Sequence, residues 1–201
     1  VAPLQVKHAS AENTIDLSQM RGSKYQPSEA WPVFETIKKE IQEGRTVLFA
    51  GTPCQVAALK QYIGDTELLI CIDIACHGVP SQRILKEKCN SIAKSKVARI
   101  DFRDKRSGWK DFSCVYFDSS GVEIAHEIAS ESDFMRGYLS NLYIRESCED
   151  CRFAAIPRVG DISLADCWIK VHDGSDKDNK GVTAILVNSE LGKALYQKAA
   201  K

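Results

Sequence analysis

Hydrophobic positions in the first half of the chain alternate between two patterns. Residues 28–43 carry apolar side chains at helical spacing with charged residues on the other side, which predicts an amphipathic helix. Short apolar runs at 46–50 and 68–74 predict buried strands, and each is followed by a predicted helix, over residues 56–62 and 82–95. This strand–helix–strand–helix order predicts an α/β fold, with a mainly parallel sheet core flanked by helices.

The second half of the chain has a less regular pattern. Residues 97–103 alternate as a strand, and the runs 112–117 and 122–125 flank the turn-forming stretch 118–121, which predicts a β-hairpin. By contrast, residues 11–30 are polar and predict a loop. The remaining predicted elements are helix 133–140, a Cys-containing irregular region over 147–168, strand 181–188 and helix 191–201.

Composition excludes some classes of function. Lys and Arg together number 27, as do Asp and Glu, so the net charge of the 201 residues is zero and no nucleic acid or anionic membrane is expected as the main partner. No apolar run reaches the length of a membrane span, and no signal-peptide pattern opens the chain. The chain begins without Met, in what reads as a strand interior, so we expect a fragment of a longer protein. We expect one domain over residues 1–201, with a subdivision near 80–100 left open.

The chain has eight cysteines, about twice an ordinary number. A chain of this size does not need disulfides to hold its core, so we expect reduced thiols in a cytoplasmic protein, several of them bound to metal. Scattered structural thiols and disulfides are the alternatives.

Two of the cysteines follow predicted parallel strands. Cys54 lies on the turn between strand 46–50 and the next helix, where the helix dipole favours a thiolate. Cys76 lies just past strand 68–74. Loops at the carboxyl ends of parallel strands form the ligand crevice of such sheets, so both cysteines are expected to face one site. Cys54 alone could be a metal ligand, a nucleophile or a buried thiol, although no base for a nucleophile is evident near it.

A C-x-x-C motif, Cys148 and Cys151, places two more sulfurs at chelating distance. Alone it could be a metal half-site, a redox dithiol or a chance occurrence. With Cys54 and Cys76 it would complete four thiolates, which suit zinc or a [4Fe–4S] cluster. Structural zinc usually joins two short-spaced motifs, so single cysteines on separate loops favour the cluster.

Several stretches, in this order, resemble the coenzyme F420 hydrogenase/dehydrogenase beta-subunit family: RGSKYQPS, GTPCQVAALK, DIACHGVPS, FRDKRSGW, CEDCRFAAIPRVGDISLADCW and KGVTAILVN. The resemblance implies an iron–sulfur flavoprotein oxidoreductase that uses a [4Fe–4S] cluster and FAD. Electrons would pass between a ferredoxin-like donor, or hydrogenase/dehydrogenase subunits, and a hydride carrier or small organic acceptor, which is coenzyme F420 for some members. The resemblance assigns the cluster to Cys54, Cys76, Cys148 and Cys151, the set that spacing also favours. The other four cysteines are then structural.

The resemblance also implies contacts to the flavin, for which cations and backbone N–H groups would hold the diphosphate. The candidate residues are Ser23, Lys24, Tyr25, Lys105, Arg158 and Asp161. A solvated Lys105 and a turn-capping Asp161 are the ordinary alternatives. His77, beside a proposed ligand, could be the proton donor, or could instead bond a cluster sulfide or cap a turn. Ala165 stands where the family pattern has glycine, and the family's ferredoxin-like segment and glycine-rich flavin-domain start are absent.

A second class of function is a non-catalytic docking module, in which zinc or iron on the same four cysteines only ties loops together. The electron acceptor and the oligomeric state cannot be read from the sequence.

Overall fold

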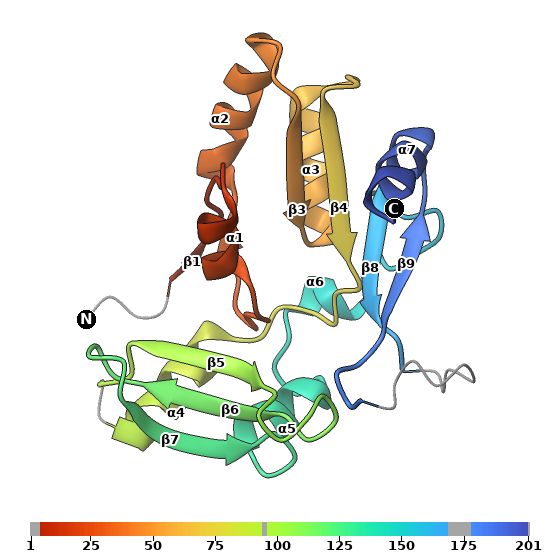
Figure 1. Cartoon of the computed structure of the whole chain (residues 1–201). Coiled ribbons are helices and arrows are strands. Elements are labelled where there is room, and N and C mark those ends of the chain that lie inside the picture. The colour runs from red at the N-terminus through yellow and green to blue at the C-terminus, as the bar shows by residue number, and fades with distance from the viewer. Residues whose placement is uncertain (1–4, 94–95, 169–177, 201) are drawn as a thin grey trace. The chain divides into compact units, whose positions relative to one another are not determined.

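The computed structural model describes residues 5–93, 96–168 and 178–200, which form two compact units (Figure 1). Unit 1 contains the described residues of Val1–Glu29, His77–Asp150 and Lys177–Lys180. Unit 2 contains those of Ala30–Cys76, Cys151–Asp176 and Gly181–Lys201. Helices and several sheets, one of them mainly parallel, confirm the predicted α/β fold. Within the described ranges, no helix is long and apolar enough to cross a bilayer.

The sheet of unit 2 has the strand order β3-β4-β8-β9. Strands β3 (Val47–Gly51), β4 (Leu69–Ile74) and β8 (Ile162–Asp166) run parallel, and β9 (Thr183–Val187) pairs antiparallel with β8. The predicted parallel core is therefore present, closed on one side by an antiparallel strand. The helices of this unit are α2 (Trp31–Gln42), α3 (Pro53–Ile63) and α7 (Glu190–Ala199).

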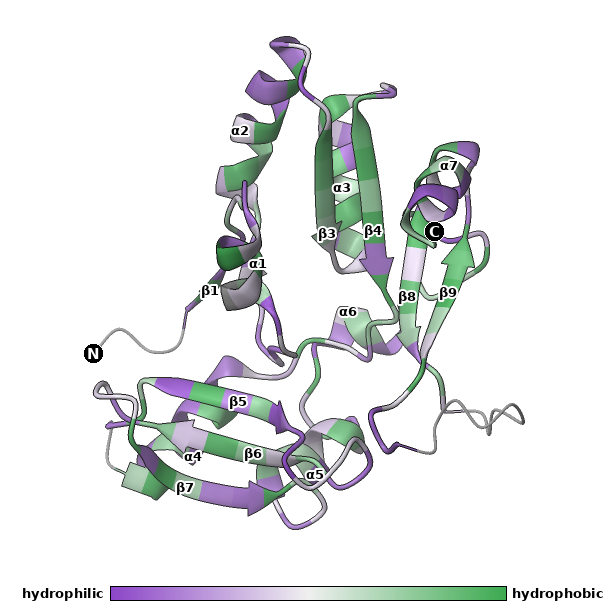
Figure 2. Ribbon diagram, viewed as in Figure 1, coloured by the Kyte–Doolittle hydropathy of each residue, from purple (hydrophilic) through white to green (hydrophobic). Residues whose placement is uncertain are grey.

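Helices α2 and α3 bury their apolar residues against β3 and β4. Phe34 of α2 meets Phe49 of β3 edge to face at 6.0 Å between ring centroids, and Leu59 of α3 has no exposed surface. The apolar character of β3 and β4 is visible along both strands in Figure 2. One face of each strand is buried, with Phe49 of β3 and Cys71 of β4 in the core, whereas Leu48 of β3 and Ile74 of β4 are about half exposed.

The sheet of unit 1 is antiparallel, with the order β5-β6-β7. Its strands are β5 (Arg99–Asp104), β6 (Ser113–Phe117) and β7 (Glu123–Ile128), with β6 and β7 forming the predicted hairpin. Helices α4 (Gln82–Ala93) and α5 (Asp133–Leu139) contribute to the same core. That core contains Leu85, Phe102, Tyr116, Phe134 and Met135, among other buried residues.

The prediction of a loop over residues 11–30 is wrong in part, because this stretch contains helix α1 (Thr14–Met20). Asn13 begins this helix by accepting hydrogen bonds from the backbone N–H groups of Ile15 and Asp16, at 2.9 and 3.0 Å. Two short strands also appear in unit 1: β1 (Val6–Lys7) and β2 (Ser28–Glu29), which pair in parallel. A short helix, α6 (Glu146–Glu149), precedes the second cysteine of the C-x-x-C motif.

Candidate functional site

Strands β3 and β4 end level with one another in unit 2. Gly51, the last residue of β3, is opposite Asp73 of β4, and Cys54 and Cys76 each lie three residues further along the chain. Both side chains are exposed, and neither is in a disulfide. The parallel register therefore delivers two accessible sulfurs to the loops at one edge of the sheet, where ligand crevices of α/β sheets form.

Cys54 lies in the first turn of α3. Thr52 is the N-cap. Its backbone N–H and its hydroxyl each donate a hydrogen bond to the Gln55 side-chain oxygen at 3.0 Å. The Thr52 hydroxyl is also 3.2 Å from the Cys54 sulfur. Pro53 supplies the preset backbone angle of a first helical residue. Together these contacts fix the turn and hold a hydroxyl against the exposed sulfur.

His77 and Gly78, in unit 1, are held by Tyr138 of α5. The Tyr138 hydroxyl donates to the Gly78 carbonyl at 2.9 Å, and the His77 Nε2 is 3.2 Å from the Tyr138 carbonyl oxygen. The two rings meet edge to face at 4.9 Å. A carbonyl can only accept, so the Nε2 of His77 carries the proton of this bond.

Cys148 lies in α6 of unit 1, close to Gly78. Gly78 has a φ of +144°, and a Cβ there would lie 3.4 Å from the Cys148 Cβ. The Arg145 N–H donates to the Val79 carbonyl at 3.0 Å, so the chain before Cys148 is bonded to the loop that follows Cys76. A glycine suits position 78 because side chains rarely adopt this backbone angle.

The chemistry of the thiols fits a four-thiolate site. Cys54 and Cys76 are exposed, whereas Cys148 and Cys151 are half-buried, and none of the four is in a disulfide. Thiolates are the ligands that iron–sulfur clusters and structural zinc prefer. Within the described ranges, no three His, Cys, Asp or Glu side chains gather as metal ligands, so the ligand set remains a prediction.

Lys24, predicted to hold flavin phosphate, bonds to the end of α1 instead of standing free. Its ammonium donates to the carbonyls of Met20, Arg21 and Gly22, at 3.0, 3.1 and 3.2 Å. Partial burial lowers the pKa of Lys24, and Asp101 opposes that shift. The cation therefore caps a helix C-terminus, a favourable position for positive charge.

The other flavin candidates of unit 1 lie in different settings. The Tyr25 ring packs against Phe102 and Tyr138, with centroids 5.7 and 5.0 Å away, and so belongs to the core of this unit. Ser23 is half-buried, and Lys105 is exposed in the turn after β5. Their contact with a flavin stays a prediction.

Asp161, in unit 2, is nearly fully buried and bonded on both oxygens. One oxygen accepts from the Cys71 backbone N–H at 2.7 Å. The other accepts from the Ser189 hydroxyl at 2.8 Å and is 3.5 Å from the Lys60 ammonium. The carboxylate thus joins β4, α3 and the start of α7, and its predicted flavin contact would be additional to this structural role.

Arg158 forms an ion pair with Asp73. Asp73 was not among the site residues predicted from the sequence. Their closest atoms, Nη2 and Oδ1, are 2.7 Å apart, and the Gly160 N–H donates to the second Asp73 oxygen at 2.7 Å. Asp73 has no exposed surface. A single carboxylate inside the apolar run 68–74 was the available signal, because a buried charge requires a partner.

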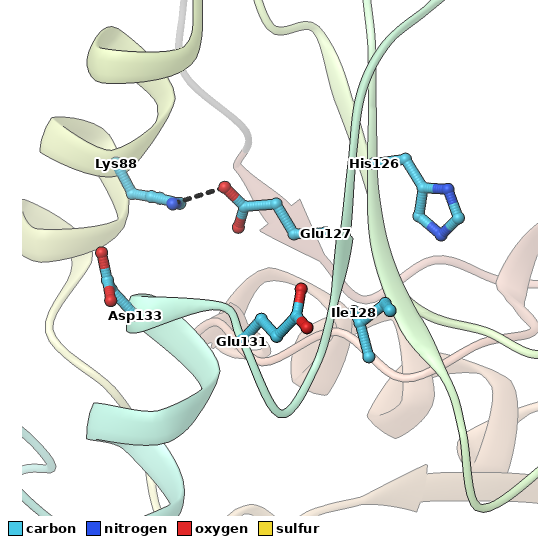
Figure 3. Close-up of a pocket in the computed structure, with 6 residues that line it drawn as sticks. All are labelled: Lys88, His126, Glu127, Ile128, Glu131 and Asp133. Atoms are coloured by element: carbon cyan, nitrogen blue, oxygen red, sulfur yellow. Dashed lines mark hydrogen bonds and ion pairs between the residues drawn. The ribbon is translucent and has the colours of Figure 1, made fainter.

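A pocket of about 470 Å³ lies in unit 1, between α4, β7 and α5 (Figure 3). Its lining residues are Lys88, His126, Glu127, Ile128, Glu131 and Asp133. Figure 3 shows Lys88 and Glu127 facing one another, and their ion pair measures 2.6 Å. None of the predicted site residues lines this pocket, and its cation already has a carboxylate partner, so we assign no ligand to it.

The burial of the cysteines predicts which of them react. Burial raises the pKa of Cys71 and Cys114 to about 12 and that of Cys89 to about 11. All three therefore remain neutral thiols at pH 8, whereas thiolates are the reactive form. With iodoacetamide at pH 8, we expect metal-free folded protein to be labelled at Cys54 and Cys76, and the three buried thiols to be labelled only after unfolding. Peptide mass spectrometry checks this, and equal labelling rates at Cys71 and Cys54 would contradict the burial.

Comparison with solved structures finds a similar fold in a chain of the F420-reducing [NiFe] hydrogenase complex from Methanosarcina barkeri. The TM-score is 0.58 at 15% sequence identity, and the match covers 96% of this chain and 61% of that one. This chain therefore spans less than two thirds of the length of that relative. No curated protein matches the sequence significantly.

The family comparison agrees with the resemblance predicted from the sequence stretches. The model of the family described as the C terminus of the coenzyme F420 hydrogenase/dehydrogenase beta subunit matches residues 44–201. That range includes the four predicted ligand cysteines and most of both units. The chain therefore belongs to the family formed by the C-terminal part of coenzyme F420 hydrogenase/dehydrogenase beta subunits.

Proposed function

We propose that residues 1–201 form an oxidoreductase domain that binds a [4Fe–4S] cluster through Cys54, Cys76, Cys148 and Cys151 and exchanges electrons with FAD. The observation that carries the proposal is the level ending of β3 and β4, which leaves two exposed cysteines, neither in a disulfide, at one sheet edge. Membership of the family supports it, since the chain shares that family's C-terminal part.

The contacts within each unit support the other two ligands. In unit 2, the segment after Cys151 is bonded to the end of β4 through Arg158. In unit 1, Cys148 lies against Gly78, two residues after Cys76 in the chain. The segment that follows Cys151 is therefore bonded to the chain before Cys76, and Cys148 contacts the chain after Cys76.

A bound cluster would supply one-electron transfer, and FAD would join single-electron donors to hydride acceptors. Residues next to the cysteines have separate proposed roles. The Thr52 hydroxyl donates to the Gln55 oxygen and lies 3.2 Å from the Cys54 sulfur, so it can turn its single proton to that sulfur when Cys54 is a thiolate. His77, the proposed proton donor, is oriented by its Nε2–H bond to the Tyr138 carbonyl.

The remaining parts of the proposal concern the flavin and the partners. Ser23, Lys24, Tyr25, Lys105, Arg158 and Asp161 are the proposed flavin contacts, with Lys24, Arg158 and Asp161 acting through positions already fixed by protein bonds. Electrons would come from a ferredoxin-like donor or from hydrogenase or dehydrogenase subunits in the cytoplasm. The acceptor would be a small molecule, with coenzyme F420 as one candidate.

Anaerobic purification tests the proposal. We expect a coloured protein with broad visible absorption that bleaches on reduction, and about four iron atoms and four sulfides per chain. Bound FAD should be released on denaturation and be detectable by its fluorescence. A colourless anaerobic preparation that holds one zinc ion would instead support the docking module and would exclude the electron-transfer function.

A further inference from the structure

The Arg158 guanidinium of unit 2 bonds to three separate parts of the chain: residues 73–74, Phe153 and Ser163. Its Nη2 donates to the Asp73 carboxylate at 2.7 Å and to the Ile74 carbonyl at 3.1 Å. Its Nη1 donates to the Phe153 carbonyl at 3.2 Å. The Arg158 side chain is only 13% exposed, and Asp73 is fully buried. The ion pair with Asp73 is thus shielded from water, unlike a surface ion pair that contributes little.

Two of the bonded carbonyls flank proposed cluster ligands. Ile74 lies two residues before Cys76, and Phe153 lies two residues after Cys151. One planar group therefore connects the two cysteine-bearing segments directly, although they are far apart in the sequence. Asp73 fixes the orientation of that group at the end of β4, with its second oxygen bound by the Gly160 N–H.

An arginine is required for this geometry. The guanidinium has five N–H donors in a rigid fork and can bond a carboxylate and two carbonyls at once, in fixed directions. A lysine in the same place would keep the charge beside Asp73 but would lack the planar fork, so it could not hold both carbonyls at these positions.

We propose that Arg158 is a positioning residue that fixes the segments carrying Cys76 and Cys151 relative to each other at the end of β4. The description of those cysteines as cluster ligands rests on the proposed function. The claim that Arg158 fixes the two segments does not depend on the proposed function, and it can be measured in metal-free protein.

Hydrogen exchange in metal-free protein tests the fixing itself. The reporters are the N–H of Ala75, which donates to the Leu164 carbonyl at 2.8 Å, and that of Ala154, which donates to the Cys151 carbonyl at 2.9 Å. In Arg158→Met we expect exchange in the peptides holding both reporters to rise together by about tenfold. Arg158→Lys, which keeps the charge and is the milder change, should raise both by less. Unchanged exchange, or a rise in only one segment, in folded Arg158→Lys would overturn the proposal.

Lys88→Met is the matched control. Lys88 is nearly as buried as Arg158, at 15% exposure, and its ion pair with Glu127 is similarly short at 2.6 Å. It lies in unit 1, and among the described residues its side chain bonds neither the segment of Cys76 nor that of Cys151. We expect this variant to leave exchange at Ala75 and Ala154 unchanged. A rise as large as that in the Arg158 variants would mean that general loss of stability, and not positioning, causes the effect.

Anaerobic cluster reconstitution then tests whether positioning serves the ligands. Arg158→Lys should load iron several-fold more slowly than the unaltered chain, with a changed electron paramagnetic resonance spectrum of the reduced cluster, whereas Lys88→Met should match the unaltered chain in both. Normal loading with an unchanged spectrum in Arg158→Lys would overturn the positioning of ligands. If the unaltered chain takes up no iron, the proposed function fails, and the exchange result alone decides whether Arg158 fixes the segments.

Discussion

Serine in place of Cys54, Cys76, Cys148 or Cys151 is expected to remove most of the cluster iron from anaerobically purified protein. A serine oxygen is a harder and more weakly binding ligand than a thiolate, so a cluster that loses one of four sulfurs is lost or incompletely assembled. Iron should fall from about four atoms per chain to below about one. Iron and sulfide assays, together with the visible absorption, measure the loss.

Two other cysteines provide the controls for this experiment. Cys89 is buried in α4 and shares no element with the proposed ligands, so Cys89→Ala should keep its iron. Cys167 is the stricter control, because it is half-buried and directly follows β8 of the same sheet. Normal iron in Cys151→Ser, or iron lost from Cys167→Ala, would show that the proposed ligand set is wrong.

Elements with a strong apolar period could be predicted from the sequence. The bounds predicted for β3, β4 and β6 agree with the observed bounds within one residue, and β7 ends three residues beyond its predicted end. Helix α1 was missed because its apolar residues, Ile15 and Leu17, remain largely exposed and give no core-facing stripe. Its signal was local, in the cap formed by Asn13.

Some features of the candidate site could likewise be predicted from the sequence, and others could not. The level edge that holds Cys54 and Cys76 could be predicted, because parallel strands align their carboxyl ends whatever the rest of the fold does. The bonds of Arg158 and Asp161 could not, since their partners Asp73 and Cys71 are distant in the sequence and no short-range pattern joins them. Residue type alone predicts a cation and a carboxylate near a cofactor. That contact stays a prediction, and the structure adds that both side chains are bonded within unit 2.

Alanine in place of Gly192 is expected to destabilise unit 2 by about 2 kcal/mol, against the usual preference of helices for alanine. Gly192 is buried in the first turn of α7, where a Cβ would lie 2.7 Å from the carbonyl carbon of Asp161 and closer still to its oxygen. Backbone atoms cannot rotate away as a side chain would. The helix must therefore withdraw from the start of β8, and the bond from Ser189 to the Asp161 carboxylate is weakened. Urea unfolding followed by circular dichroism measures the change.

Lys193→Ala is the control, because Lys193 is the next residue of α7, is largely exposed, and contributes a single ion pair to Glu190. We expect that variant to lie within about 0.5 kcal/mol of the unaltered chain. Intrinsic helix propensity alone would make Gly192→Ala more stable by about 1 kcal/mol, so the sign of the effect decides the matter. An increase in stability would mean that α7 does not pack against the Asp161 backbone. The hydrogen bond from Ser189 to the Asp161 carboxylate would then be wrong as well.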